Sequence, residues 1–83
     1  MNDKGTHFPQ YRMLSNGKTY YKITGDRNFE EIQIMGSRLV RHVFIAEQYP
    51  EILRIKDMLE GYEGIYVTIE ADYYADLLKR MAL

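Results

Sequence analysis

The sequence contains no cysteine and only two prolines in its 83 residues. The lack of cysteine excludes disulfides, thiolate metal sites, iron–sulfur clusters and thiol nucleophiles. No apolar run approaches the ~18 residues that a membrane-spanning helix needs. The first ten residues, MNDKGTHFPQ, lack the apolar stretch of a secretory signal. We therefore expect a cytoplasmic protein that does not enter a membrane.

The chain also lacks an excess of charge of one sign. Eleven Lys and Arg residues against twelve Asp and Glu residues give a formal net charge of −1. This balance argues against a strong field for nucleic acid or for anionic membranes. The apolar fraction of 46% is ordinary for a globular protein. Eight of the residues are tyrosine, whose apolar body and polar tip suit half-buried sites and interfaces.

Alternating apolar residues and turn formers predict strands in the first half of the chain. The four predicted strands span residues 11–14, 18–24, 29–35 and 38–46. Asn16-Gly17 is a strong hairpin signal because both residue types tolerate positive φ. Gly36-Ser37 marks a second tight turn. Short turns of this kind join neighbouring antiparallel strands.

In the second half the period of the apolar residues changes to that of a helix. Pro50 suits a first helical turn and Gly61 suits a helix end, so we predict a helix over 50–60. A fifth strand over 64–70 and a helix over 71–83 complete the order ββββαβα. The pattern does not say at which edge of the sheet the fifth strand pairs.

This order predicts an α+β fold. We expect an antiparallel meander of four to five strands with two helices packed on one face of the sheet. The chain is long enough for one domain and not for two. Residues 1–9 are polar and without periodicity, which predicts a flexible N-terminal arm followed by a single domain over 10–83.

Hairpin geometry extends this prediction to the register of the strands. A two-residue loop at 16–17 predicts the pair Met13–Tyr20, a four-residue loop at 25–28 predicts Tyr21–Ile32, and a two-residue loop at 36–37 predicts Ile34–Leu39. One face of the sheet then gathers aliphatic residues for the helices to cover. The other face, the predicted aromatic face, carries Tyr11, Met13, Tyr20, Val40 and Phe44.

A sheet face that meets only water should be mostly polar, and the predicted aromatic face is not. Burying one large ring is worth about 1.5–3 kcal/mol, so these rings need a cover. The N-terminal arm, a second copy or a foreign partner could supply it. A slipped register, or a helix that crosses to this side, would remove the need. We predict a small non-enzymatic protein-interaction module that forms a homodimer, or binds another protein, through this face.

An alternative function is nucleic-acid binding. Tyr20 lies between Lys18 and Lys22, a pattern typical of surfaces where bases stack on a ring while cations hold phosphates. Together with Arg38, these residues form the alternative site of a nucleic-acid-binding accessory protein. The segment NGKTYYKI lacks the glycine and aromatic signature of an RNA-recognition motif.

The titratable residues do not form a catalytic or metal-binding set. His42 faces Glu31 in the predicted register, but no nucleophile stands beside this pair. His7 and His42 have no ligand partner at metal-binding spacing. Asp72 and Asp76 share a helix face and are typical of a solvated acidic surface. We therefore expect no enzymatic activity, no cofactor and no bound metal.

Overall fold

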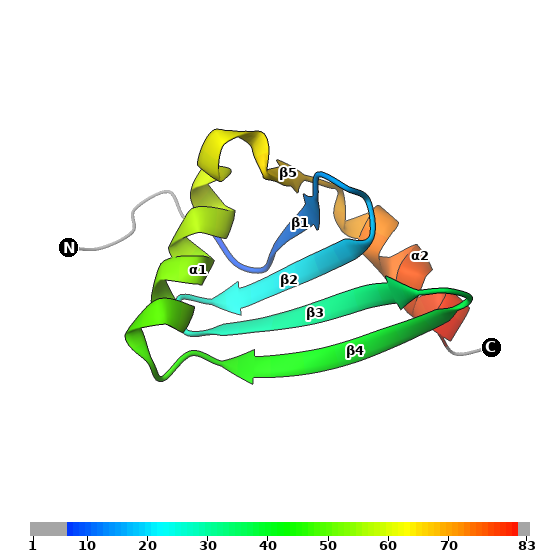
Figure 1. Cartoon of the computed structure of the whole chain (residues 1–83), viewed down its shortest axis with the longest axis horizontal. Helices are drawn as coiled ribbons and strands as arrows, with labels where there is room; N and C mark the ends of the chain where they lie inside the picture. Colours follow the sequence, from blue (N-terminus) through cyan, green and yellow to red (C-terminus); the bar gives the residue numbers. More distant parts are fainter. Residues whose placement is uncertain (1–6, 82–83) are drawn as a thin grey trace.

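The computed structural model describes residues 7–81 of the chain. It forms an antiparallel five-stranded sheet with two helices in the predicted order ββββαβα, an α+β fold (Figure 1). The strands are β1 (Gln10–Leu14), β2 (Thr19–Gly25), β3 (Asn28–Met35), β4 (Arg38–Ile45) and β5 (Tyr66–Thr68). The helices are α1 (Tyr49–Glu60), the 3-10 turn η1 (Tyr62–Gly64) and α2 (Ala71–Met81).

The order of the strands in the sheet is β4-β3-β2-β1-β5. The first four strands form the predicted meander. β5 returns to pair antiparallel with β1, through contacts such as Met13 opposite Val67. β4 and β5 are therefore the two edges of the sheet.

Two of the three predicted strand registers are confirmed. Met13 pairs with Tyr20 across the first turn, where Gly17 has a φ of +74° and donates its N–H to the Leu14 carbonyl at 2.8 Å. At the third turn, Gly36-Ser37, the predicted pair Ile34–Leu39 is also present. Positive φ at these glycines allows tight reversals that match the twist of the strands.

The register of the middle hairpin differs because β2 contains a bulge. Gly25 pairs with Asn28 next to the turn, but Ile23 pairs with Phe29. Thr24 is therefore an extra residue in β2 that has no counterpart in β3. Beyond the bulge the pairing is shifted by one residue from the prediction.

This one-residue shift exchanges the faces of β1 and β2 relative to β3 and β4. The predicted pair Tyr21–Ile32 is wrong: Tyr21 pairs with Glu31, and Ile32 pairs with Tyr20. Since side chains alternate between the faces of a sheet, every residue of β3 and β4 changes sides relative to β2.

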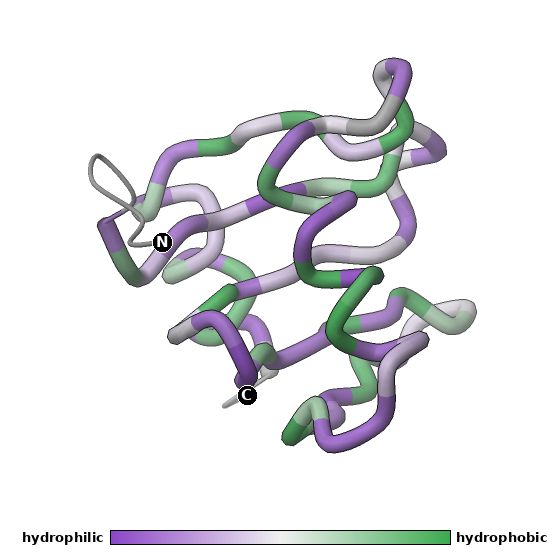
Figure 2. Tube along the Cα trace, turned by 90° about the vertical axis from the view of Figure 1, so that its left-hand side faces the viewer, coloured by the Kyte–Doolittle hydropathy of each residue, from purple (hydrophilic) through white to green (hydrophobic). Residues whose placement is uncertain are grey.

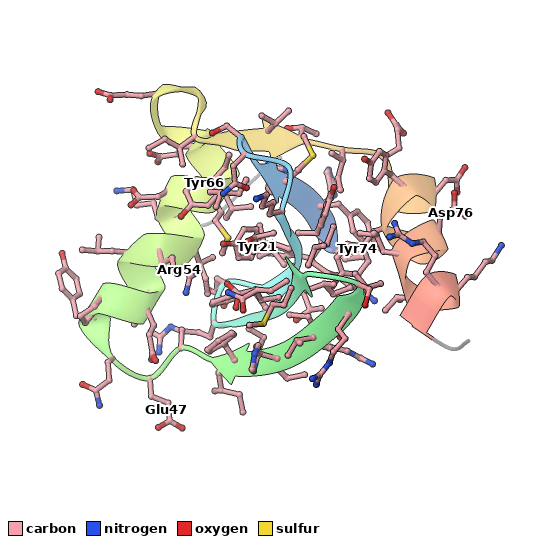
Figure 3. The ribbon with its side chains drawn as sticks, turned by 45° about the vertical axis from the view of Figure 1, so that its right-hand side comes forward. Tyr21, Glu47, Arg54, Tyr66, Tyr74 and Asp76 are labelled. Atoms are coloured by element: carbon pink, nitrogen blue, oxygen red, sulfur yellow. The ribbon has the colours of Figure 1, made fainter. Side chains whose placement is uncertain are left out.

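The two helices consequently cover opposite faces of the sheet, and the prediction that both pack on one face is wrong. The α1 cluster consists of the buried residues Tyr21, Ile23, Phe29, Ala46, Ile55 and Met58. The α2 cluster consists of the buried residues Tyr20, Ile32, Tyr74 and Leu77. Figure 3 shows Tyr21 on the α1 side and Tyr74 on the α2 side. Each face carries apolar residues, so each face needs a helix to bury them.

The ends of α1 are set by residues that the sequence identifies and by one that it does not. Pro50 lies in the first turn, and Gly61 ends the helix with a φ of +84°. The last turn of α1 contains no basic residue. Arg12, in β1, instead donates from Nε to the Met58 carbonyl at 2.9 Å and from Nη2 to the Leu59 carbonyl at 3.3 Å. A distant guanidinium thus caps the carbonyls of the last turn.

Both helices are amphipathic. Hydrophobic and hydrophilic segments alternate along α1, on the side that faces the viewer in Figure 2. In α1 the buried residues are Ile55 and Met58. The N-terminal segment adds Phe8, which packs against the α1 cluster although the sequence assigns it to the arm. Residues 1–6 of that predicted arm lie outside the described residues.

Candidate interaction edge

The five residues of the predicted aromatic face do not share a surface. Tyr11, Met13 and Tyr20 lie on the face that α2 covers and contact the α2 cluster or belong to it. Phe44 packs against the α1 cluster on the other face. Val40 lies four residues before Phe44 in β4, and because side chains alternate along a strand, both lie on the same face. The bulge at Thr24 is the physical reason, because it brings β2 and β3 together in a different register.

Tyr20 is buried by α2 and is 5% exposed. Its ring stacks on Tyr73 with the ring centroids 5.7 Å apart, and its hydroxyl donates to the Gly17 carbonyl at 2.9 Å. Burial, reinforced by the neighbouring Tyr73, raises the pKa of Tyr20 to about 12. The ring is held inside the molecule and is not available to stack on a base.

The cations of the alternative nucleic-acid site lie partly at one end of the sheet and partly within it. Lys18 lies in the β1–β2 turn and Arg38 next to the β3–β4 turn, at one end of the sheet. Lys22 pairs with Tyr11 and Glu30 inside the sheet. The structure therefore does not place these cations around an exposed ring, because Tyr20 is buried.

The His42–Glu31 pair exists in the sheet, but its carboxylate is bound elsewhere. Glu31 is 5% exposed, and its Oε2 accepts a hydrogen bond from Arg54 Nη2 at 2.9 Å. Arg54 also donates to the Tyr21 hydroxyl at 3.1 Å (Figure 3). The guanidinium lies 5.4 Å from the centre of the Phe29 ring, within cation–π range. Glu31 is thus part of a structural network that holds α1 on the sheet.

A shallow concavity of about 390 Å³ lies beside α1. It is lined by Phe8, Asp26, Ile52, Ile55, Lys56, Leu59 and Glu60. These residues include no histidine and no hydroxyl nucleophile. In the part of the chain that the structure describes, no three His, Cys, Asp or Glu side chains gather as a metal site requires.

The most distinctive surface is the free edge of β4, which runs along one rim of the sheet in Figure 1. Eight continuous pairs join β4 to β3, from Met35–Arg38 to Asn28–Ile45, without a bulge. The opposite edge, β5, is only three residues long. β4 therefore presents the longest unpaired main chain of the described residues.

The direction of the main-chain groups of β4 follows from the hydrogen-bond pattern. The Ala46 N–H donates to the Arg27 carbonyl at 2.7 Å, on the β3 side. In an antiparallel pair the hydrogen-bonded residues alternate. The four residues whose N–H and C=O groups point away from β3 are therefore Leu39, Arg41, Val43 and Ile45.

The side chains along this edge are unusually apolar for an exposed strand. Val43 is 68% exposed and Ile45 is 61% exposed. Both lie on the α2 side of the sheet, on the same face as Leu39. Arg41, between Leu39 and Val43, forms an ion pair with Glu30 at 3.2 Å. Natural proteins usually protect such an edge with proline, a bulge or charged side chains; β4 has no proline and no bulge, and its charged residues are Arg38 and Arg41.

The sequence alone did not identify this edge. The segment RLVRHVFI predicts a strand but not its position in the sheet. The segment has no acidic residue, glycine or proline, which indicates that β4 would pair readily with another strand if its edge were exposed. The edge position itself depends on β5 pairing with β1 rather than with β4.

Comparisons of the chain with protein-family models, with curated proteins and with solved structures find no match. Within residues 7–81, neither helix is long and apolar enough to cross a membrane.

Proposed function

We propose that this protein is a non-enzymatic interaction module that binds an extended polypeptide strand along β4. In this mode a partner strand extends the sheet, main-chain hydrogen bonds supply affinity, and alternate side chains supply specificity. The observation that carries the proposal is the combination of a long unpaired edge with exposed Val43 and Ile45 on it. Of the aromatic residues in the predicted interface, Tyr20 is buried in the core, and Tyr11 and Phe44 are partly buried against it.

The energies favour a binding event of modest affinity. Four outward-facing residues offer about eight main-chain hydrogen bonds, each worth about 0.5–1.5 kcal/mol net. Covering the exposed Val43 and Ile45 side chains adds part of the about 1.5–3 kcal/mol that complete burial of each would supply. Association costs about 4–15 kcal/mol in lost freedom. The gains and the cost are of similar size, which favours a transient complex over a permanent one.

The test uses a probe strand of known sequence. An acetylated and amidated peptide with the sequence of residues 38–45 is added to isotope-labelled protein, at a concentration at which the protein alone is a monomer, and amide hydrogen exchange is followed by NMR. We expect the amides of Leu39, Arg41, Val43 and Ile45 to become protected. A scrambled peptide of the same composition is the control for sequence. Failure of the native peptide to protect these amides, up to its solubility limit, would refute the proposal.

A matched pair of variants locates the binding surface. Val43→Lys places a charge on the β4 edge, whereas Val67→Lys makes the same change on β5, where Val67 is 40% exposed. We expect Val43→Lys to weaken peptide binding and Val67→Lys to leave it unchanged. Equal weakening by the two variants would mean that the peptide responds to net charge and does not bind β4.

A further inference from the structure

We infer that the strand bound by β4 is β4 of a second copy, paired antiparallel about a two-fold axis that passes through His42. The inference rests on the proposed function and names its partner. It joins two five-stranded sheets into one sheet of ten strands. It also predicts which side chains meet, because the main chain of β4 allows few registers.

The main-chain directions restrict the possible pairings. Residues 39, 41, 43 and 45 point their N–H and C=O groups outward. In a symmetric antiparallel pair, these residues must face each other across the axis. Three such registers keep most of β4 paired. They differ in the residue that lies opposite its own copy on the axis, which is Arg41, His42 or Val43.

Charge and overlap choose among these three registers. With Arg41 on the axis, two guanidinium groups stand directly opposite each other, which is unfavourable. With Val43 on the axis, Leu39 faces Glu47, which lies beyond the end of β4, so only residues 41–45 of the strand pair. With His42 on the axis, residues 39–45 all pair within the strand and no like charges of Arg are opposed.

The His42 register also matches side chains across the junction. On the α2 side, Leu39 faces Ile45 of the second copy and Arg41 faces its Val43. On the α1 side, Val40 faces Phe44 of the second copy. The Arg41 charge is already matched by Glu30 within each copy, at 3.2 Å. Pairing therefore covers the exposed aliphatic side chains of β4 without bringing in an unmatched charge.

The two His42 residues form a pair without mutual hydrogen bonds at the centre of the junction. In such a pair the two Cα atoms lie about 4.5 Å apart, which is within the range that a disulfide spans. His42 is exposed on the edge, and its ring lies 6.1 Å from that of Phe44. A cysteine at this position should link the two copies under mild oxidation.

Because the sequence contains no cysteine, a single introduced cysteine can form a disulfide only with the same residue of a second copy. Three single-cysteine variants, Arg41→Cys, His42→Cys and Val43→Cys, each place a thiol on the axis of one register. We expect His42→Cys to form the disulfide-linked dimer fastest. Faster linking of either neighbouring variant would overturn the His42 register.

Light scattering after gel filtration, over a range of concentrations, measures whether the copies associate. We expect a wild-type mass that rises to that of a dimer, a monomer for Val43→Lys, and the wild-type behaviour for Val67→Lys. Circular dichroism confirms that each variant keeps the wild-type fold. A dimer that Val43→Lys leaves intact would place the contact on another surface and overturn the inference.

The peptide experiment separates failure of this inference from failure of the proposed function. A wild-type monomer at every concentration, without cross-linking at residue 42, overturns self-association. If the peptide still protects the β4 amides, the edge binds strands but two folded copies do not pair through it. If the peptide also fails, the proposed function fails with it.

Discussion

Tyr20 and Tyr21 are neighbours in β2, yet they belong to different hydrophobic clusters on opposite faces of the sheet. Tyr20 packs under α2, with its ring stacked on Tyr73. Tyr21 packs under α1, where its hydroxyl accepts a hydrogen bond from Arg54. The tandem pair thus contributes one ring to each layer and helps to hold both helices on one sheet. A second buried face explains why adjacent residues can both be aromatic.

Replacement of Tyr20 should reduce stability. Loss of a buried aromatic side chain typically costs about 3–5 kcal/mol, and we expect this from Tyr20→Ala in urea unfolding. Tyr20→Phe keeps the ring and loses only the hydrogen bond to the Gly17 carbonyl, so it should cost about 1 kcal/mol. Equal losses in the two variants would contradict burial of the ring under α2.

Arg12 should stabilise the C-terminal turn of α1. Burial lowers the pKa of Arg12 from its ordinary value, but the guanidinium is held by carbonyls at 2.9 and 3.3 Å. Arg12→Met removes these donors, and we expect a loss of about 1.5–3 kcal/mol in the free energy of unfolding. Amide exchange should accelerate in the last turn of α1 but not in α2. Arg12→Lys keeps fewer donors than arginine, so its free energy of unfolding should lie between those of wild type and Arg12→Met.

The ion pair between Arg54 and Glu31 should show strong coupling. Arg54→Met leaves the buried Glu31 carboxylate without its partner. Because the Arg54 side chain is 38% exposed, we expect a cost of about 1–3 kcal/mol, below that of a fully buried pair. Adding Glu31→Gln to Arg54→Met should cost less than the sum of the two single changes. Strict additivity in this double-mutant cycle would contradict the contact.

Stability should fall in alkaline solution because of buried tyrosines. Burial raises the pKa of Tyr20 to about 12, and burial next to the Glu30 charge raises the pKa of Tyr74. The folded state keeps these protons while an unfolded tyrosine loses its proton near pH 10. Their contribution is therefore complete below pH 10 and decreases as the pH rises from 10 to 12. Each such tyrosine should reduce stability by about 1.4 kcal/mol per pH unit in that window.

A pair of tyrosine variants tests this pH dependence. The Tyr74 hydroxyl is buried and has no hydrogen-bond partner among the described residues. Tyr74→Phe should therefore change the free energy of unfolding little at pH 7. Between pH 10 and 12 it should reduce the slope of that free energy against pH by the share of one tyrosine. Tyr49 is 71% exposed, and Tyr49→Phe is the control for loss of a surface hydroxyl. A slope that is the same in Tyr74→Phe and wild type would contradict the burial of that hydroxyl.

The sequence by itself determined the elements and most of their boundaries. Asn16-Gly17 and Gly36-Ser37 placed the turns correctly, because few residue types tolerate the positive φ that these turns need. Pro50 and Gly61 marked α1 for the same local reason. The order ββββαβα follows from such local preferences together with the spacing of apolar residues.

Only the tertiary structure decided which residues share a face and which strand is exposed. The bulge at Thr24 shifts the β2–β3 register by one residue, and side chains with a period of two then change sides. The pairing of β5 with β1 leaves β4 as a free edge. Both outcomes depend on contacts between segments far apart in the chain, and the local pattern of residues does not encode them.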